Sequence, residues 1–254
     1  MRVVILGSAT SYGVPVIGCR CATCTSTDPH NKRTRASAWV ESDEGAHLLI
    51  DSGPEMRLQL LREGLTQVEA VLYTHLHADH TAGIDDLKAF NARLGGVLPC
   101  YGDAGTHASL RERFAYAFAG TPWIGLIPHI GFTVVDAAPF HVGGTCVQPI
   151  PMRHGAIRST GYRIGDFAYL TDTSGIPNAS LALLRNLSVL VVDALRWESH
   201  PTHFSVPEAL ELIEDLQPER AFLTHVGHTL EHETTNQRVG PRTQVAYDGL
   251  RIDL

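Results

Sequence analysis

The residues with the clearest capacity for chemistry are four side chains within one short stretch: His75, His77, Asp79 and His80. Imidazole nitrogens and carboxylate oxygens are the donors that hold Zn²⁺ or Mn²⁺ in proteins. The apolar run before them, residues 70–73, predicts a buried strand, so the cluster would occupy a tight turn between that strand and a helix. His75 and His77 can then point the same way while Asp79 and His80 face a neighbouring position, which suits two adjacent ions.

Three further donors lie later in the chain, each close to a short apolar run: His154, Asp172 and His225. A single histidine at a strand end is more often a hydrogen-bonded structural residue, and a polar loop with chance histidines is the alternative for the first cluster, since the chain has 14 of them. Taken together and in this order, the H-x-H-x-D-H pattern and the three later donors resemble the metallo-β-lactamase superfamily over nearly the whole chain.

The resemblance implies an α/β fold in which two related halves face each other as a four-layer αββα sandwich, with the metals at one edge between the sheets. We expect residues 1–254 to form one metallo-β-lactamase-like hydrolase domain. A superfamily aspartate that supports the ligand loop from behind matches Asp51, after the apolar run 48–50. An Asx-turn that closes the strand is the alternative role, and the two are compatible.

The resemblance also implies two catalytic divalent ions, Zn²⁺ or Mn²⁺. Two such ions about 3.5–4 Å apart share a water, lower its pKa and stabilise an in-line displacement, so the nucleophile would be a hydroxide that bridges the metals. Asp79 would serve the catalytic machinery as well as the metal. One ion would bind His75, His77 and His154, the other Asp79, His80 and His225, and Asp172 would bridge them.

A second constellation is the cysteine loop formed by Cys19, Cys21 and Cys24. Closely spaced cysteines in a cytoplasmic protein bind metal more often than they form disulfides, and three thiolates need a fourth ligand for a closed tetrahedral zinc site. One subset of the superfamily carries this C-x-C-x-x-C loop with a distant H-x-x-H, which makes His228 the candidate fourth ligand of a structural Zn²⁺. A redox or chance cluster is the alternative. That subset includes the cyclic phosphodiesterase of the carbon–phosphorus lyase pathway.

The same subset has a histidine between the metal aspartate and the last metal histidine, where this chain has His203. In the family it approaches the scissile phosphate and assists the leaving oxygen. Imidazole, with a pKa near 6.5, can donate a proton near neutral pH. His200 is the competing candidate; His203 is preferred because it occupies the position of the family motif.

The function that the resemblance implies is hydrolysis of a small phosphodiester, cyclic diesters included, by a metal-dependent enzyme. Residues 157–162 depart from the family where substrate would be contacted, which leaves the substrate open. The alternatives are a lactonase, a thioesterase or a nuclease on the same fold, and an accessory protein of cofactor biosynthesis. No G-x-S-x-G elbow and no phosphate-binding P-loop occurs in the sequence.

Composition limits the partners. The chain has 254 residues, 44% hydrophobic and 19% charged, with a net charge of −7, which argues against long nucleic acids. No apolar run approaches the roughly 18 residues of a membrane helix, and no signal peptide precedes residues 2–7, so we expect a cytoplasmic protein without a membrane partner. The resemblance implies a homodimer. The two remaining cysteines, Cys100 and Cys146, are expected in the core.

Short strands and helices alternate along the chain without a linker. Periodicity predicts helices at 55–63, 85–93, 105–118 and 207–216, the last with Ser205 as its N-cap and Pro207 in its first turn. Alternating or continuous apolar runs predict strands at 3–6, 38–41, 48–50, 71–74, 132–135, 146–150, 168–170, 189–192 and 221–223.

Overall fold

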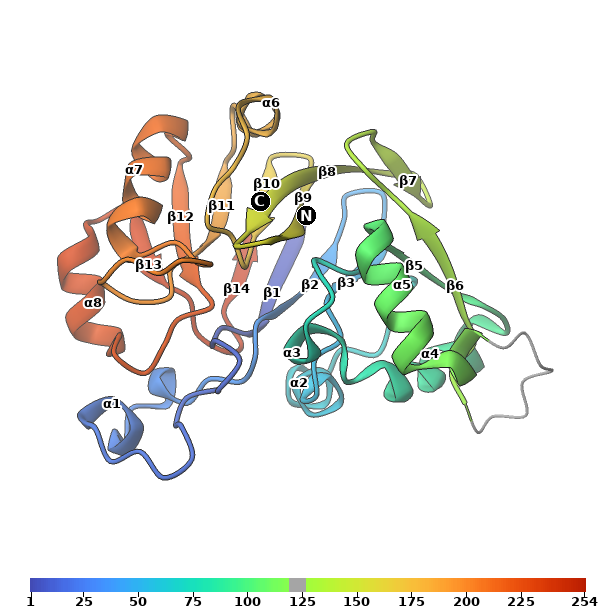
Figure 1. The fold of residues 1–254 in the computed structure, drawn as a ribbon, viewed down its shortest axis with the longest axis horizontal. Helices are drawn as coiled ribbons and strands as arrows, with labels where there is room; N and C mark the ends of the chain where they lie inside the picture. The colour runs from blue at the N-terminus through green and yellow to red at the C-terminus, as the bar shows by residue number, and fades with distance from the viewer. Residues whose placement is uncertain (119–126) are drawn as a thin grey trace.

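Two seven-stranded sheets lie face to face in the computed structural model, which describes residues 1–118 and 127–254 (Figure 1). The strands of the first sheet, in spatial order, are β14 (Arg251–Asp253), β1 (Arg2–Gly7), β2 (Ser37–Glu41), β3 (His47–Ile50), β4 (Ala70–Leu72), β5 (Leu98–Gly102) and β6 (Ile130–Val134). Those of the second are β13 (Thr243–Val245), β12 (Arg220–Thr224), β11 (Val189–Asp193), β10 (Phe167–Leu170), β9 (Ile157–Ile164), β8 (Thr145–His154) and β7 (Phe140–Val142).

The two sheets follow the same plan. The first is antiparallel from β14 to β3 and parallel from β3 to β6. The second is antiparallel from β7 to β10 and parallel from β10 to β13. This repetition is the arrangement of related halves that the resemblance implied.

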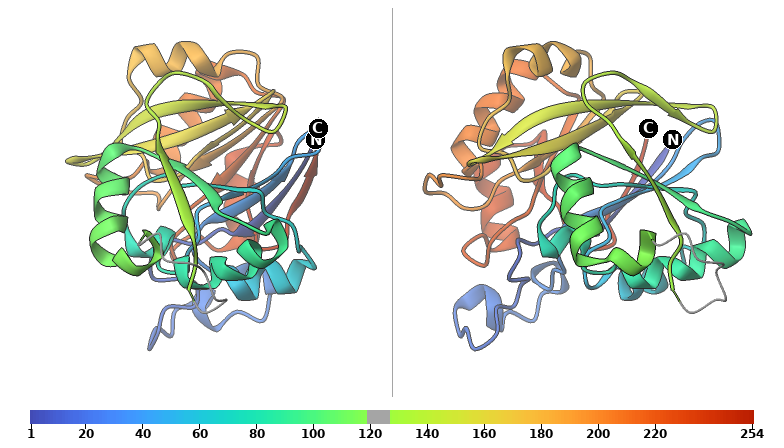
Figure 2. Two further views of the ribbon diagram at one scale, coloured as in Figure 1. Left: turned by 90° about the vertical axis from the view of Figure 1, so that its right-hand side faces the viewer. Right: turned by 45° about the vertical axis from the view of Figure 1, so that its right-hand side comes forward.

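Helices cover the outer faces of both sheets, so the αββα expectation is confirmed (Figure 2). The first sheet is covered by α2 (Met56–Glu63), η2 (Ile84–Leu87), α4 (Lys88–Leu94) and α5 (Ala104–Arg113), the second by η4 (Ala182–Leu184), α7 (Val206–Leu216) and α8 (His232–Val239). The remaining short elements are α1 (Ala22–Thr25), η1 (Pro29–Asn31), α3 (Ala78–Thr81), η3 (Ala115–Phe118) and α6 (Asn178–Leu181).

The central core lies between the sheets, and strand alternation divides the apolar side chains between it and the outer layers. In β1, Val3 and Ile5 pack into the inter-sheet core, whereas Val4 and Leu6 pack under α2 and α4. All four side chains are fully buried. Strands buried on both faces read as continuous apolar runs, which is why the sequence identified them.

Helix α7 begins where the sequence predicted. The Ser205 side chain accepts a hydrogen bond from the backbone of Glu208, and the Glu208 carboxylate accepts one from the backbone of Ser205, which completes a capping box. The expected helix at 85–93 is instead divided into η2 and α4. It follows a close contact at Gly83, where a Cβ would lie 2.2 Å from the carbonyl oxygen of Gly53.

Other expectations are corrected by the structure. Strands β5, β7, β9, β13 and β14 had not been predicted. Cys100 is buried, as expected, but the prediction for Cys146 was wrong: its side chain is exposed, because alternate residues at the start of β8 face outward. No helix within residues 1–118 and 127–254 is long and apolar enough to span a membrane.

Candidate metal centres

Polar residues occupy the carboxyl ends of the parallel strands in both sheets. Asp51 follows β3, His75 comes shortly after β4, Asp172 follows β10, Asp193 ends β11 and His225 follows β12. Within a sheet, parallel strands present their carboxyl ends at the same edge. The two sheets bring these edges together, since side chains of the two sets lie within a few ångströms of one another.

The predicted strand-to-helix turn is present between β4 and α3. His77 directly precedes α3, which carries Asp79 and His80 in its single turn. Nε2 of His75 lies 2.9 Å from Nδ1 of His77, and Nε2 of His80 lies 3.2 Å from Oδ2 of Asp79. The loop therefore offers two separate pairs of donors, as the spacing predicted.

The later donors complete two groups. His75, His77, His154 and Asp172 have donor atoms within 4.8 Å of one another, and so do Asp79, His80 and His225. Asp172 lies between the groups: Oδ1 is 3.2 Å from Nε2 of His80, and Oδ2 is 3.4 Å from Nε2 of His225 and 3.7 Å from Nε2 of both His75 and His154. This is the position that a bridging carboxylate would occupy.

The donor set fits divalent ions. Metal–nitrogen and metal–oxygen bonds of about 2.0–2.2 Å place neighbouring donors roughly 3–3.5 Å apart, close to the separations observed. Nε2 of His80 and both ring nitrogens of His225 are buried without a hydrogen-bond partner among the described residues. Buried polar atoms are rarely left unpaired, and a coordinated ion would satisfy Nε2 of both side chains.

The electrostatics agree with the same assignment. Burial lowers the pKa of His75, His77 and His154, which keeps these imidazoles in the neutral form that coordinates metal. Burial alone would raise the pKa of Asp172, but the surrounding imidazoles, that of His225 foremost, hold it well below its usual value. His80 has a raised pKa despite its burial because Asp172 and other carboxylates surround it. The pocket favours positive charge, which divalent ions would supply.

Polar contacts at Nδ1 orient two of the donor imidazoles, those of His80 and His154. Oδ2 of Asp51 lies 2.7 Å from Nδ1 of His80, and the same carboxylate accepts hydrogen bonds from the Thr74 backbone at 2.8 Å and hydroxyl at 2.7 Å. Nδ1 of His154 lies 2.7 Å from the carbonyl oxygen of Thr202. Such contacts fix the orientation of an imidazole and leave Nε2 for a metal. Asp51 thus lies in the supporting position expected from the sequence.

The backbone is unusual at three of these residues. Asp51, Asp172 and His225 have φ angles of 63°, 52° and 57°. Non-glycine residues in this left-handed region carry a cost of order 1–3 kcal/mol each and cluster at functional sites. Asp51 and His225 directly follow a parallel strand and Asp172 lies two residues beyond one, so each reversal of the backbone falls at the shared edge.

The cysteine loop also forms a compact donor group. Sγ of Cys19, Cys21 and Cys24 lie 3.3, 3.4 and 3.6 Å from Nδ1 of His228, which belongs to the segment after β12. A tetrahedral site with Zn–S bonds of about 2.3 Å and Zn–N bonds of about 2.0–2.1 Å gives similar separations. The backbone N–H of Cys24 lowers the pKa of Cys21 to about 6, which favours the thiolate that binds metal. The four residues fit a structural zinc ion.

His203 and His200 lie beside the His/Asp donor groups in different settings. Nδ1 of His203 is 2.9 Å from Oδ2 of Asp193, whereas His200 contacts the hydroxyl of Thr202 at 3.1 Å. Donor spacing also groups His203 with Asp172 and His225, so the imidazole lies within reach of a metal. Asp193 was not identified as a functional residue from the sequence, although the apolar run 189–192 before it carries the same signal as the run before Asp172.

A cavity of about 260 Å³ opens over the donors. Apart from Ile157, the side chains around it are polar, which suits a small charged ligand. The residues that line it are Ser11, His77, Asp79, His154, Ile157, Asp172, Thr202, His203 and His225.

Comparison with known proteins agrees with this geometry. A family model described as "Beta-lactamase superfamily domain" matches residues 46–226, a range that contains all seven donors of the two His/Asp groups but not the cysteine loop or His228. An octanoyltransferase of Porphyromonas gingivalis is 35% identical over 252 residues, which are 98% of this chain and 51% of that protein. A coenzyme PQQ synthesis protein B of Methylobacterium radiotolerans is 42% identical over 101 residues, 35% of this chain and 34% of the relative. The chain thus spans about half the length of the first relative.

Among solved structures, a diphosphatase of the PhnP family is 40% identical, with a TM-score of 0.92 over 100% of this chain and 97% of that chain. Zn²⁺-bound PqqB of Methylobacterium extorquens shares the fold at 22% identity, with a TM-score of 0.80 over 100% of both chains. The matching model covers most of the chain, and the fold and the donor groups agree with it. The chain belongs to the metallo-β-lactamase superfamily.

Proposed function

We propose that the chain is a dinuclear metal-dependent phosphodiesterase that hydrolyses a small phosphodiester, cyclic diesters included. The observation that carries the proposal is the place of His203. Its imidazole lines the cavity over the metal donors, and Asp193 holds it at Nδ1. A histidine fixed in this way presents Nε2 on the opposite edge of the ring, where it can donate a proton to the leaving oxygen of a bound ester.

The residues divide the reaction between them. One ion would be held by His75, His77 and His154. The other would be held by Asp79, His80 and His225, and Asp172 would be shared between them. The ions, when bound, would lower the pKa of water and neutralise charge on the phosphoryl oxygens.

Proton transfer is the task of the chain itself. As a water oxygen attacks phosphorus and the bond to the leaving oxygen breaks, His203 would give its Nε2 proton to that oxygen. Asp193 would stabilise the imidazolium form before transfer, because its carboxylate faces Nδ1.

Size and similarity support a small phosphorus ester. A cavity of about 260 Å³ has room for a phosphoryl group with a compact substituent. The 40% identical relative is called a diphosphatase. Cleavage of a diphosphate and of a phosphodiester both break a bond between phosphorus and a bridging oxygen, so one arrangement of donors serves either.

The decisive experiment is a substrate panel with protein reconstituted with Zn²⁺ or Mn²⁺. We expect turnover of bis(4-nitrophenyl) phosphate and of small cyclic diesters, and loss of that turnover on chelation. A dinucleoside diphosphate tests the diphosphatase reaction. Activity on a lactone or thioester with none on any phosphorus ester would contradict the proposal.

A second candidate, hydrolysis of an acyl ester or thioester, is favoured by the octanoyltransferase of which this chain spans about half. The lining of the cavity over the donors argues against this second candidate, because Ile157 is its one apolar side chain. Octanoyl thioesters belong in the panel for this reason. The accessory role that similarity to PQQ synthesis protein B would favour predicts no turnover of any panel member.

A further inference from the structure

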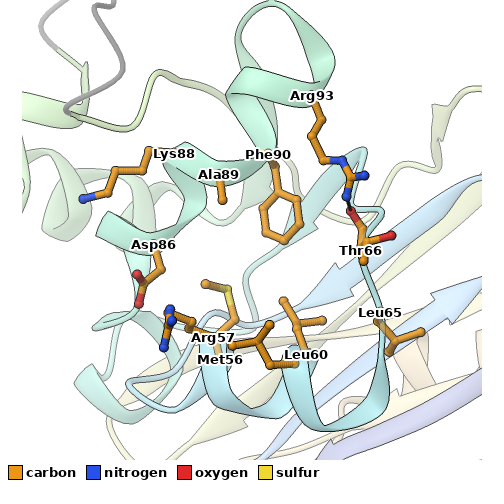
Figure 3. A pocket seen from close by; sticks show the side chains of 11 residues that line it. Met56, Arg57, Leu60, Leu65, Thr66, Asp86, Lys88, Ala89, Phe90 and Arg93 are labelled. Carbon is orange, nitrogen blue, oxygen red and sulfur yellow. Dashed lines mark hydrogen bonds between the residues drawn. The ribbon is translucent and has the colours of Figure 1, made fainter.

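A second cavity lies on the outer face of the first sheet, between α2 and the segment formed by η2 and α4. Its volume is about 390 Å³, and it shares no lining residue with the cavity over the metal donors. Figure 3 shows the Phe90 side chain directed from α4 toward Met56 and Leu60 of α2. The cavity is therefore separate from the catalytic centre and is formed by two helices.

The floor of this cavity is apolar. Met56, Leu60 and Phe90 line it and are 1%, 5% and 7% exposed, so their contacts with the sheet fix its shape. Leu61, also on α2, lines the cavity but is 63% exposed. Covering such an exposed apolar side chain and the apolar floor beside it with a hydrocarbon removes apolar surface from water and lowers the free energy.

The charged residues at the rim are mostly basic. Arg57, Lys88 and Arg93 line the cavity, against the one acid Asp86. This excess contrasts with the net charge of −7 for the chain. Figure 3 places Arg57, Lys88 and Asp86 at one end of the cavity, and Arg93 at the other.

Arg93 is the one charged lining residue at its end of the cavity, whereas Arg57 and Lys88 share their end with the acid Asp86. Nη1 of Arg93 donates to the carbonyl oxygen of Thr66 at 2.8 Å, which fixes the guanidinium at the mouth. Arginine has five N–H donors, so others are left for a ligand. At the opposite end Lys88 pairs with Asp85, which reduces its charge.

We propose that this cavity binds a single-chain fatty carboxylate, with the hydrocarbon between α2 and α4 and the carboxylate at Arg93. The volume lies at the small end of the roughly 300–1,000 Å³ found for ligand cavities, which suits one alkyl chain better than a peptide helix about 10 Å across. A guanidinium is the side chain that best matches a planar carboxylate.

The test uses decanoate, decanol and butyrate as probes, titrated into the full chain and followed by amide chemical shifts. Saturable binding of decanoate with shifts in α2 and α4 is expected, and butyrate should bind at least ~10-fold more weakly because it buries far fewer methylenes. Leu61→Asp should weaken decanoate binding by ~10-fold or more, since the charge would lie against the chain.

Matched variants separate this site from general surface effects. Leu58→Asp lies on the same helix, at a residue that is 62% exposed but does not line the cavity, and it should leave decanoate binding unchanged. Arg93→Gln should weaken the binding of decanoate but not that of decanol. Arg111→Gln, on α5, should change the binding of neither probe. Equal losses for Leu58→Asp and Leu61→Asp, an equal effect of Arg93→Gln on both probes, or no saturable binding would overturn the proposal.

Discussion

Oδ2 of Asp193 lies 2.9 Å from Nδ1 of His203 and also accepts a hydrogen bond from the backbone N–H of Thr173 at 2.8 Å. The second bond anchors the carboxylate to the loop that carries Asp172, so the orientation of the His203 ring is coupled to the position of the proposed bridging ligand. Oδ1 of Asp193 is also 3.7 Å from Nδ1 of His225. One carboxylate therefore faces both the proposed acid and a proposed ligand.

If His203 is the general acid, its removal should matter most for substrates whose leaving group needs a proton. We expect His203→Ala to reduce turnover of an alkyl diester by about 10²–10⁴-fold, and much less for a nitrophenyl diester. Steady-state rates on the two substrates, with metal content measured in parallel, provide the check. His200→Ala is the control and should have little effect. Metal loss from His203→Ala would assign the residue as a ligand instead.

Asp193→Asn tests the orienting role separately. The amide keeps the shape of the side chain but removes the charge that stabilises an imidazolium, so we expect activity to fall by about 10–100-fold. The fall should be larger on an alkyl diester than on a nitrophenyl diester, because the alkoxide leaving group needs the proton. A variant with normal activity on both substrates would limit Asp193 to a structural contact.

Asp172→Asn probes the proposed bridge between the two donor groups. Asparagine tolerates the positive φ at this position, whereas alanine would add backbone strain to the lost carboxylate. We expect the variant to lose at least one of the two catalytic ions and nearly all turnover while keeping the zinc of the cysteine loop. Elemental analysis of the variant measures the metal content. Asp166→Ala, which changes an exposed aspartate, is the control. Full metal content with full activity would show that another residue bridges.

Loss of the zinc site in the cysteine loop should lower the stability of the fold more than it lowers catalytic activity. Cys21→Ser should remove one ion of three per chain, and a loss of about 3 kcal/mol would lower Tm by roughly 6–12 °C for a chain of this size. Cys146→Ser changes an exposed cysteine outside both groups and should leave Tm unchanged. Lost activity at unchanged Tm in Cys21→Ser would place the loop in the active site.

A hydrogen bond between the sheets lies beneath the ligand turn. The Tyr162 hydroxyl, on β9, donates to the carbonyl oxygen of Tyr73 at 2.7 Å, two residues before His75. Tyr162→Phe leaves that buried oxygen unpaired and should cost about 1–3 kcal/mol in the free energy of unfolding. Tyr169 is also fully buried, but its hydroxyl has no hydrogen-bond partner among the described residues, so Tyr169→Phe should be close to neutral. Denaturant unfolding of both variants distinguishes the cases.

The metal donors could be predicted because each signal is local: an apolar run followed by a histidine or aspartate. Their division into two groups came from the family resemblance, and the structure brings the same residues together. Asp193 has the same local signal, but its importance depends on contact with His203, which lies within the loop that joins β11 to α7. That contact is tertiary and could not be read from spacing.

The outer parts of the sheets were harder to predict for a related reason. Strands β13 and β14 have three residues each and take their stability from neighbouring strands rather than from a pattern of their own. Cys146 shows that residue type alone does not predict burial, since a cysteine among apolar residues faces solvent when its position in the pleat requires it.

The division of the donors between two sheets has a consequence for tuning the enzyme. Asp79 and His80 lie in α3, beyond a strand of the first sheet, Asp172 and His225 lie beyond strands of the second, and the layer between the sheets includes Val191. The separation of the proposed ions is therefore a property of core packing as much as of the ligands. Substitutions at such interior positions, which touch neither metal nor substrate, should alter reactivity by small changes in sheet spacing, so rate-altering variants are expected well away from the visible cavity.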